Sequence, residues 1–123
     1  WLAGWLEGEG CFYWRIGIIR DRPGRRTGGC ACLTAGSTDE DVLTRAATIL
    51  GATTLGPRIY KNYPTRKAFW NFQLAGASAV GWMMMFYSLM GLRRQTQIRK
   101  VLTQWKQLEP TKGSLTFLRK RFP

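Results

Sequence analysis

The sequence contains no histidine and few acidic residues. The absence of histidine from 123 residues excludes nucleases and hydrolases whose base or metal ligand is an imidazole. Only 7 Asp and Glu stand against 19 Lys and Arg, which gives a formal net charge of +12. A basic excess this large, spread along the chain, indicates a polyanionic partner, with nucleic acid ahead of a membrane surface. A basic protein without such a partner is the alternative.

Cysteine is also scarce. Cys11, Cys30 and Cys32 are odd in number and include no CxxC pair, so the sequence predicts neither a disulfide framework nor a zinc site. Reduced, buried thiols in the cytoplasm are expected instead. The apolar stretch at 81–92 is too short to span a bilayer, and no signal peptide is recognisable, so we expect no membrane partner.

The hydrophobic content of 45% is sufficient for one folded α+β domain over 1–123. Hydrophobic periodicity and turn residues predict the order α-β-β-α-β-β-α-α. The helices are expected at 1–8, 37–51, 77–91 and 92–107, and the strands at 11–20, 30–36, 54–63 and 68–76. The second helix should bury Val42, Ala46, Ile49 and Leu50, the third should be capped by Ser78, and residues 110–123 stay unassigned.

The segment Leu2–Gly10, LAGWLEGEG, closes an apolar helix with glutamates. Gly4 and Gly8 lie one turn apart, and small residues at that spacing let two helices approach closely. A face packed on the domain's own core is the alternative. Glu9 lies at the helix C-terminus, where the macrodipole already places negative charge, and a symmetry-related Glu9 would add repulsion. A divalent cation relieves both effects, and Mg²⁺ prefers such oxygen ligands.

This segment resembles the signature of the LAGLIDADG homing endonucleases. The match covers Leu2, Ala3, Gly4, Leu6, Gly10 and the two acidic positions, whereas Trp5 and Gly8 depart from the pattern. The αββαββα order and the segments EGEGCF, STDEDV and LMGLRRQTQI extend the resemblance over most of the chain. It implies an antiparallel, saddle-shaped sheet with helices on one face, and a homodimer interface formed by Leu2, Ala3, Gly4, Trp5 and Gly8.

The activity implied by the resemblance is Mg²⁺-dependent hydrolysis of double-stranded DNA at a pseudo-palindromic target by a homodimer. Such proteins are encoded by phages, bacteria or organelles, in an intron or intein setting. A DNA-binding regulator that does not cut and an RNA maturase of the same fold are the alternatives. The intact Glu9 favours the nuclease, because binding alone needs no carboxylate at the dimer axis.

The resemblance also assigns roles to residues near the motif. Glu9 is the metal ligand, and Glu7 is structural. Arg93 or Arg94, at the start of the last helix, is the basic residue near the scissile phosphate. Thr38 or Asp39 (or Ser37) orders the attacking water, with plain N-capping of the helix as the alternative.

Strand alternation assigns the sheet faces. Phe12, Trp14, Ile16 and Ile18, with Trp70, Phe72 and Leu74, are expected to face the helices. The opposite face carries Tyr13, Arg15, Gly17 and Ile19 and, in the second hairpin, Phe69, Asn71 and Gln73. In the resembled family this face lies in the major groove, where arginine and amide side chains read base edges. The expected DNA contacts also include the hairpin residues Arg20, Arg22, Arg25, Arg26, Arg58, Tyr60, Lys61, Arg66 and Lys67.

Overall fold

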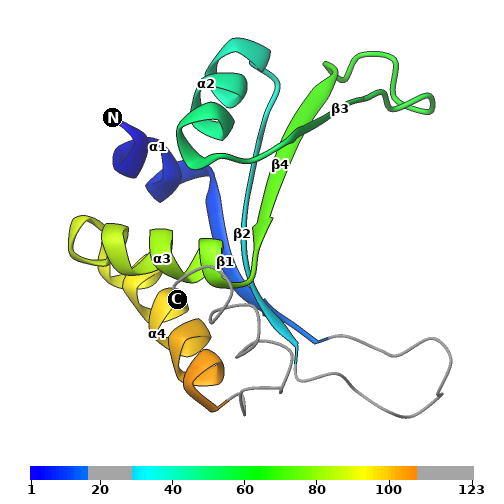
Figure 1. Cartoon of the computed structure of the whole chain (residues 1–123). Coiled ribbons are helices and arrows are strands. Elements are labelled where there is room, and N and C mark those ends of the chain that lie inside the picture. Colours follow the sequence, from blue (N-terminus) through cyan, green and yellow to red (C-terminus); the bar gives the residue numbers. More distant parts are fainter. Residues whose placement is uncertain (17–28, 108–123) are drawn as a thin grey trace, which may run out of the picture.

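The structure is a computed structural model that describes residues 1–16 and 29–107 (Figure 1). The predictions for Ile18, Ile19, Gly17, Arg20, Arg22, Arg25 and Arg26, and for the segment 110–123, lie outside the described residues. None of the helices within the described ranges has the length and apolarity that crossing a membrane requires.

The described elements follow the predicted order, which is confirmed. They are α1 (Leu2–Glu9), β1 (Gly10–Arg15), β2 (Cys30–Ser37), α2 (Glu40–Leu50), β3 (Thr54–Arg58), β4 (Phe69–Ala75), α3 (Ala77–Phe86), the 3₁₀ turn η1 (Tyr87–Leu89) and α4 (Leu92–Gln107).

The four strands form one antiparallel sheet in the order β1-β2-β4-β3. All the helices that the structure describes lie on one side of the curved sheet, and no described element covers the other side (Figure 1). Helix α4 packs on β1, α3 on β2 and β4, and α2 on β4 and β2. The α+β architecture with helices on a single face is therefore as predicted. One hydrophobic core lies between the sheet and the helices.

Helix α2 illustrates how the sequence determines the ends and the buried face of a helix. Its acidic residues Glu40 and Asp41 lie in the first turn, where they interact favourably with the helix dipole, and Gly51 ends the helix in a left-handed conformation. The buried face is formed by Leu43, Ala46, Ala47 and Leu50. The prediction that Ile49 belongs to this face is wrong: Ile49 is 48% exposed.

Two other sequence predictions need correction. Ser78 does not cap α3, because the helix begins at Ala77 and its N-cap residue is Gly76. The strand predicted over 54–63 ends at Arg58, so the segment 59–68 forms a long connection to β4. Pro57 lies on the edge strand β3. It falls within the register shift between Leu55 and Arg58, where a missing N–H costs no ladder hydrogen bond.

Candidate functional site

The C-terminal end of α1 is attached to the start of α4. The Glu7 carboxylate accepts a hydrogen bond from the Gly91 backbone N–H at 2.9 Å. Glu9 is the last residue of α1, and its side chain is exposed. The two glutamates therefore differ: Glu7 joins two elements of the same chain, and Glu9 is free to meet an external ligand.

Arg94 makes the second attachment. Its Nε donates to the Glu7 carbonyl at 3.0 Å and its Nη2 to the Gly8 carbonyl at 3.3 Å, while Nη1 donates to Gln97 at 3.1 Å. Arg94 as a whole is 6% exposed. It places a positive charge at the C-terminus of α1, where the helix dipole favours a cation. Arg93, the other predicted catalytic arginine, is exposed on α4.

Replacement of Arg94 should therefore destabilise the fold. Arg94→Met keeps the apolar stem but leaves the Glu7 and Gly8 carbonyls without these donors, so we expect the free energy of unfolding to fall by about 1–3 kcal/mol. Arg93→Met on the exposed side of the same helix should change it by no more than about 0.5 kcal/mol. Urea unfolding followed by circular dichroism measures both. Equal losses in the two variants would contradict this role of Arg94.

The corner between β2 and α2 lies at the same end of the sheet. Gly10 pairs with Ala35, so the end of α1 and the corner 37–39 adjoin in the β1–β2 register. Ser37 Oγ accepts a hydrogen bond from the Asp39 N–H at 3.0 Å. Asp39 is the N-cap residue of α2 but makes no side-chain cap bond, and Thr38 is exposed. The end of α1 thus adjoins both the 37–39 corner and the start of α4.

Acidic residues gather at this end. Every acidic residue that the structure describes belongs either to α1, as Glu7 and Glu9, or to the segment Asp39–Asp41. Within residues 1–16 and 29–107, however, no three side chains of His, Cys, Asp or Glu are grouped closely enough to hold a metal ion. The exposed Glu9 carboxylate is a hard oxygen donor of the kind Mg²⁺ takes, so one chain fits the ion as half a site that a second Glu9 would complete.

The outward face of α1 is open. A Cβ added at Gly4 or Gly8 would meet no atom within 4 Å, so both glycines present bare backbone at the surface. Ala3 and Trp5 are half-buried, and Trp5 stacks on Trp1 with ring centroids 6.2 Å apart. The assignment of Leu2 to the interface needs correction, because Leu2 is 9% exposed and packs in the core of its own chain.

The open face of the sheet has the composition that alternation predicts. In the register, Tyr13 pairs with Cys32 and Arg15 with Cys30, whereas Phe12 pairs with Leu33 on the helix side. Likewise Asn71 and Gln73 share the open face, and Trp70, Phe72 and Leu74 face the helices. Polar side chains from three strands therefore line one surface.

Hydrogen bonds hold several of these side chains in place. Gln73 Nε2 donates to Tyr13 Oη at 3.3 Å, and burial, followed by the nearby Cys32, raises the pKa of the tyrosine, which keeps its hydroxyl neutral. Arg15 Nη2 donates to Cys30 Sγ at 3.4 Å. The Asn71 Oδ1 atom is buried and has no hydrogen-bond partner among the described residues.

Sequence reasoning missed the thiols on this face. The prediction of buried cysteines holds for Cys32, but Cys30 is half-buried and Cys11 is exposed. The available signal was the spacing of two between Cys30 and Cys32, which puts both on one face of a strand.

A further contact on this face depends on Gly36. A Cβ at this position would lie 2.1 Å from the Phe69 ring, so the ring covers the glycine backbone.

The connection between β3 and β4 carries an aromatic and basic cluster. The Arg66 guanidinium lies 4.8 Å from the Tyr63 ring centroid and 5.2 Å from that of Tyr60. These cation–π contacts fix the otherwise exposed arginine. The other predicted DNA contacts in and beside this connection, Arg58, Lys61 and Lys67, are exposed.

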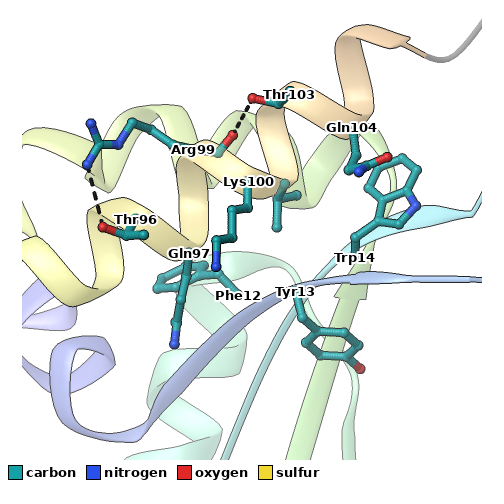
Figure 2. Close-up of a pocket in the computed structure, with 10 residues that line it drawn as sticks. Phe12, Tyr13, Trp14, Thr96, Gln97, Arg99, Lys100, Thr103 and Gln104 are labelled. Atoms are coloured by element: carbon teal, nitrogen blue, oxygen red, sulfur yellow. Dashed lines mark hydrogen bonds between the residues drawn. The ribbon is translucent and has the colours of Figure 1, made fainter.

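A groove of about 540 Å³ runs between α4 and β1. Figure 2 shows Trp14 beside Gln104 of α4 and Tyr13 turned away from that helix, as expected for opposite faces of one strand. None of the predicted catalytic residues lines the groove. The predicted catalytic residues thus lie outside the groove, whereas Tyr13, a predicted DNA contact, belongs to its lining.

The fold has known counterparts among solved structures. The homing endonuclease I-CvuI, in complex with its target, matches with a TM-score of 0.64 and 23% identity over 84% of this chain and 62% of that one. The homing endonuclease I-TnaI matches with a TM-score of 0.62 and 15% identity over 96% and 80%. The archaeal intron-encoded homing endonuclease I-Vdi141I, complexed with DNA, gives 0.58 and 15% over 79% and 60%.

The chain spans about three-fifths of the length of I-CvuI. No protein-family model and no curated protein sequence matches it. Below 25% identity, the structural likeness establishes the architecture, in which the signature-like segment forms the first helix and leads directly into the sheet. The chain therefore has the fold of the LAGLIDADG homing endonucleases, the family that the segment Leu2–Gly10 resembles.

Proposed function

We propose that this protein is a homodimeric, site-specific DNA endonuclease of the homing type, which hydrolyses phosphodiester bonds with Mg²⁺ or another divalent cation. The observation that carries the proposal is the exposed Glu9 carboxylate at the end of a helix whose Gly4 and Gly8 backbone is open. Two such helices packed face to face bring two carboxylates together beside two DNA-binding sheets.

Different residues have different roles in the proposed cleavage reaction. Glu9 of each chain would hold the cation, which when bound would activate water and stabilise charge on the phosphate oxygens. Arg94 holds the last turn of α1 through the Glu7 and Gly8 carbonyls and so acts as a positioning residue. The exposed Arg93 contacts the phosphate, and Thr38 or Asp39 orders the attacking water.

The open sheet face and the β3–β4 connection supply the DNA contacts. Arg15, Asn71 and Gln73 lie on the open face and would read base edges. Positive charge that favours phosphates comes from the end of β3 and the β3–β4 connection, with Arg58, Lys61, Arg66 and Lys67. The net charge of +12 supports the same partner. A homing role implies in addition that the gene lies in an intron or an intein.

A cleavage selection tests the proposal directly. The protein is incubated with a plasmid library of random inserts, with Mg²⁺ or with EDTA, and linear molecules are sequenced. We expect Mg²⁺-dependent cutting at a pseudo-palindromic site, because a twofold dimer presents the same surface to both half-sites. Binding to an enriched site without any cutting would favour a non-cleaving regulator, and preference for RNA would favour a maturase.

The two kinds of DNA contact should respond differently to substitution. Lys67→Ala should weaken binding to all DNA sequences alike and reduce the slope of log affinity against log salt by about 0.9. Arg15→Ala should instead relax the preference at one base position, at a cost of about 1–3 kcal/mol. Fluorescence anisotropy with single-substitution targets at several salt concentrations measures both effects. A uniform loss from Arg15→Ala would show that this residue contacts phosphate.

A further inference from the structure

Two thiols lie side by side on the open face of the sheet. Cys30 Sγ and Cys32 Sγ are 3.7 Å apart, and both cysteines are free. They project from the same face of β2 because they are two residues apart in a strand. Cys32 is 0% exposed, while Cys30 is half-buried and reachable from solvent.

The separation of the two sulfurs suits a metal ion. Two thiolates bound to a tetrahedral Zn²⁺ at about 2.3 Å are about 3.8 Å apart, close to the distance observed here. A disulfide would need the sulfurs at about 2.05 Å and Cα atoms no more than about 6.8 Å apart, a limit that residues i and i+2 of a strand only just meet. Cation binding therefore requires less rearrangement of β2 than oxidation does.

Polar side chains flank the pair. Arg15 Nη2 lies 3.4 Å from Cys30 Sγ, and the Gln73 amide nitrogen lies 3.5 Å from Cys32 Sγ. The described residues offer no third ligand in a group with the two cysteines. Water would complete the coordination shell, as at sites with few protein ligands.

We infer that Cys30 and Cys32 bind one thiophilic divalent cation, such as Zn²⁺, and that its occupancy opposes DNA binding. Each thiol releases its proton to solvent as its sulfur–metal bond forms, so the two thiolates balance the charge of the cation. The second half of the inference rests on the proposed function. A hydrated cation between Arg15 and Gln73 would occupy the surface that these two side chains need to reach base edges.

Cadmium is a suitable probe because its thiolate complexes absorb in the ultraviolet. We expect Cd²⁺ titration of the reduced, DNA-free protein to give a charge-transfer band that saturates at one ion per chain, and Zn²⁺ to remove it by competition. Cys30→Ser and Cys32→Ser should each lose the band. Cys11→Ser, which alters an exposed thiol outside the pair, should keep it.

Absence of a saturable band, or its persistence in Cys30→Ser, would overturn the site. Cys30 is only half-buried, so circular dichroism should show that this variant remains folded even where Cys32→Ser does not. The DNA arm uses anisotropy with and without one equivalent of Cd²⁺. We expect at least about a tenfold loss of affinity for the parent and Cys11→Ser and none for Cys30→Ser. A full band with unchanged DNA affinity would overturn the regulatory half alone, and a protein that binds no DNA would refute the proposed function without affecting the band.

Discussion

Glu9→Gln should abolish cleavage in Mg²⁺ while leaving DNA binding intact. Glutamine keeps nearly the same shape but removes the charge that holds the cation, so we expect the cleavage rate to fall at least about 10²-fold. Affinity for the same target should be equal or higher, because two fewer carboxylates repel the phosphates. Single-turnover cleavage in Mg²⁺ and gel-shift titration in Ca²⁺ measure the two effects on one substrate.

Glu7→Gln is the matched control for this substitution. Glu7 accepts a hydrogen bond from Gly91, and a glutamine oxygen can accept the same bond, so cleavage should be largely retained. If Glu9→Gln cuts as fast as the parent protein, Glu9 holds no catalytic metal. If Glu7→Gln is instead the variant that loses cleavage, Glu7 rather than Glu9 holds the metal.

Gly4→Leu should convert the dimer into monomers and so remove cleavage as well. The added side chain meets no atom of its own chain, and leucine is the better helix former by about 0.8–1 kcal/mol, so the monomer should fold. Across a close helix–helix contact the same side chain would separate the two backbones and with them the Glu9 carboxylates. Sedimentation velocity and cleavage of the pseudo-palindromic target test these outcomes.

Gly81 provides the control for the dimer experiment. It is also an exposed helical glycine with no atom within 4 Å of an added Cβ, but it lies on α3. Gly81→Leu should therefore remain dimeric and active. A Gly4→Leu protein that still sediments as a dimer would place the interface elsewhere, and the large exposed side chains of Met84, Met85, Leu89 and Leu92 would be the next surface to alter.

The sequence predicted most of the fold because hydrophobic periodicity is a local property. Strand alternation placed Phe12 and Phe72 on the helix side and Tyr13 and Gln73 on the open side, as the register shows. Helix ends were harder to predict. Ser78 has the chemistry of a cap, but Gly76, with a positive φ that strands and helices rarely permit, makes the turn from β4 into α3 two residues earlier.

The site was predictable only in part, because contacts between distant segments leave little trace in a sequence. Arg93 and Arg94 are neighbours of the same residue type, so the sequence does not distinguish them. Only Arg94 reaches the end of α1, where it donates hydrogen bonds to carbonyls more than 80 residues earlier in the chain. Leu2 belongs to the signature-like segment. Whether Leu2 faces a partner or the interior depends on how the short helix α1 is rotated about its own axis, and in the structure Leu2 faces the interior. The approach of Cys30 to Cys32 follows from strand pleating and needed no tertiary information.

The gathering of the described acidic residues at α1 and Asp39–Asp41 has a consequence for the approach to a polyanion. Positive charge elsewhere on the chain and negative charge at one end give the molecule a permanent electric dipole moment. In the field of a duplex this moment exerts a torque that turns the acidic end away from the phosphates, so the Glu9 end would reach the backbone only with a bound cation that offsets its charge. Ionic strength would therefore alter the fraction of productive collisions as well as the lifetime of the complex, since a shorter screening length leaves less time for the molecule to turn.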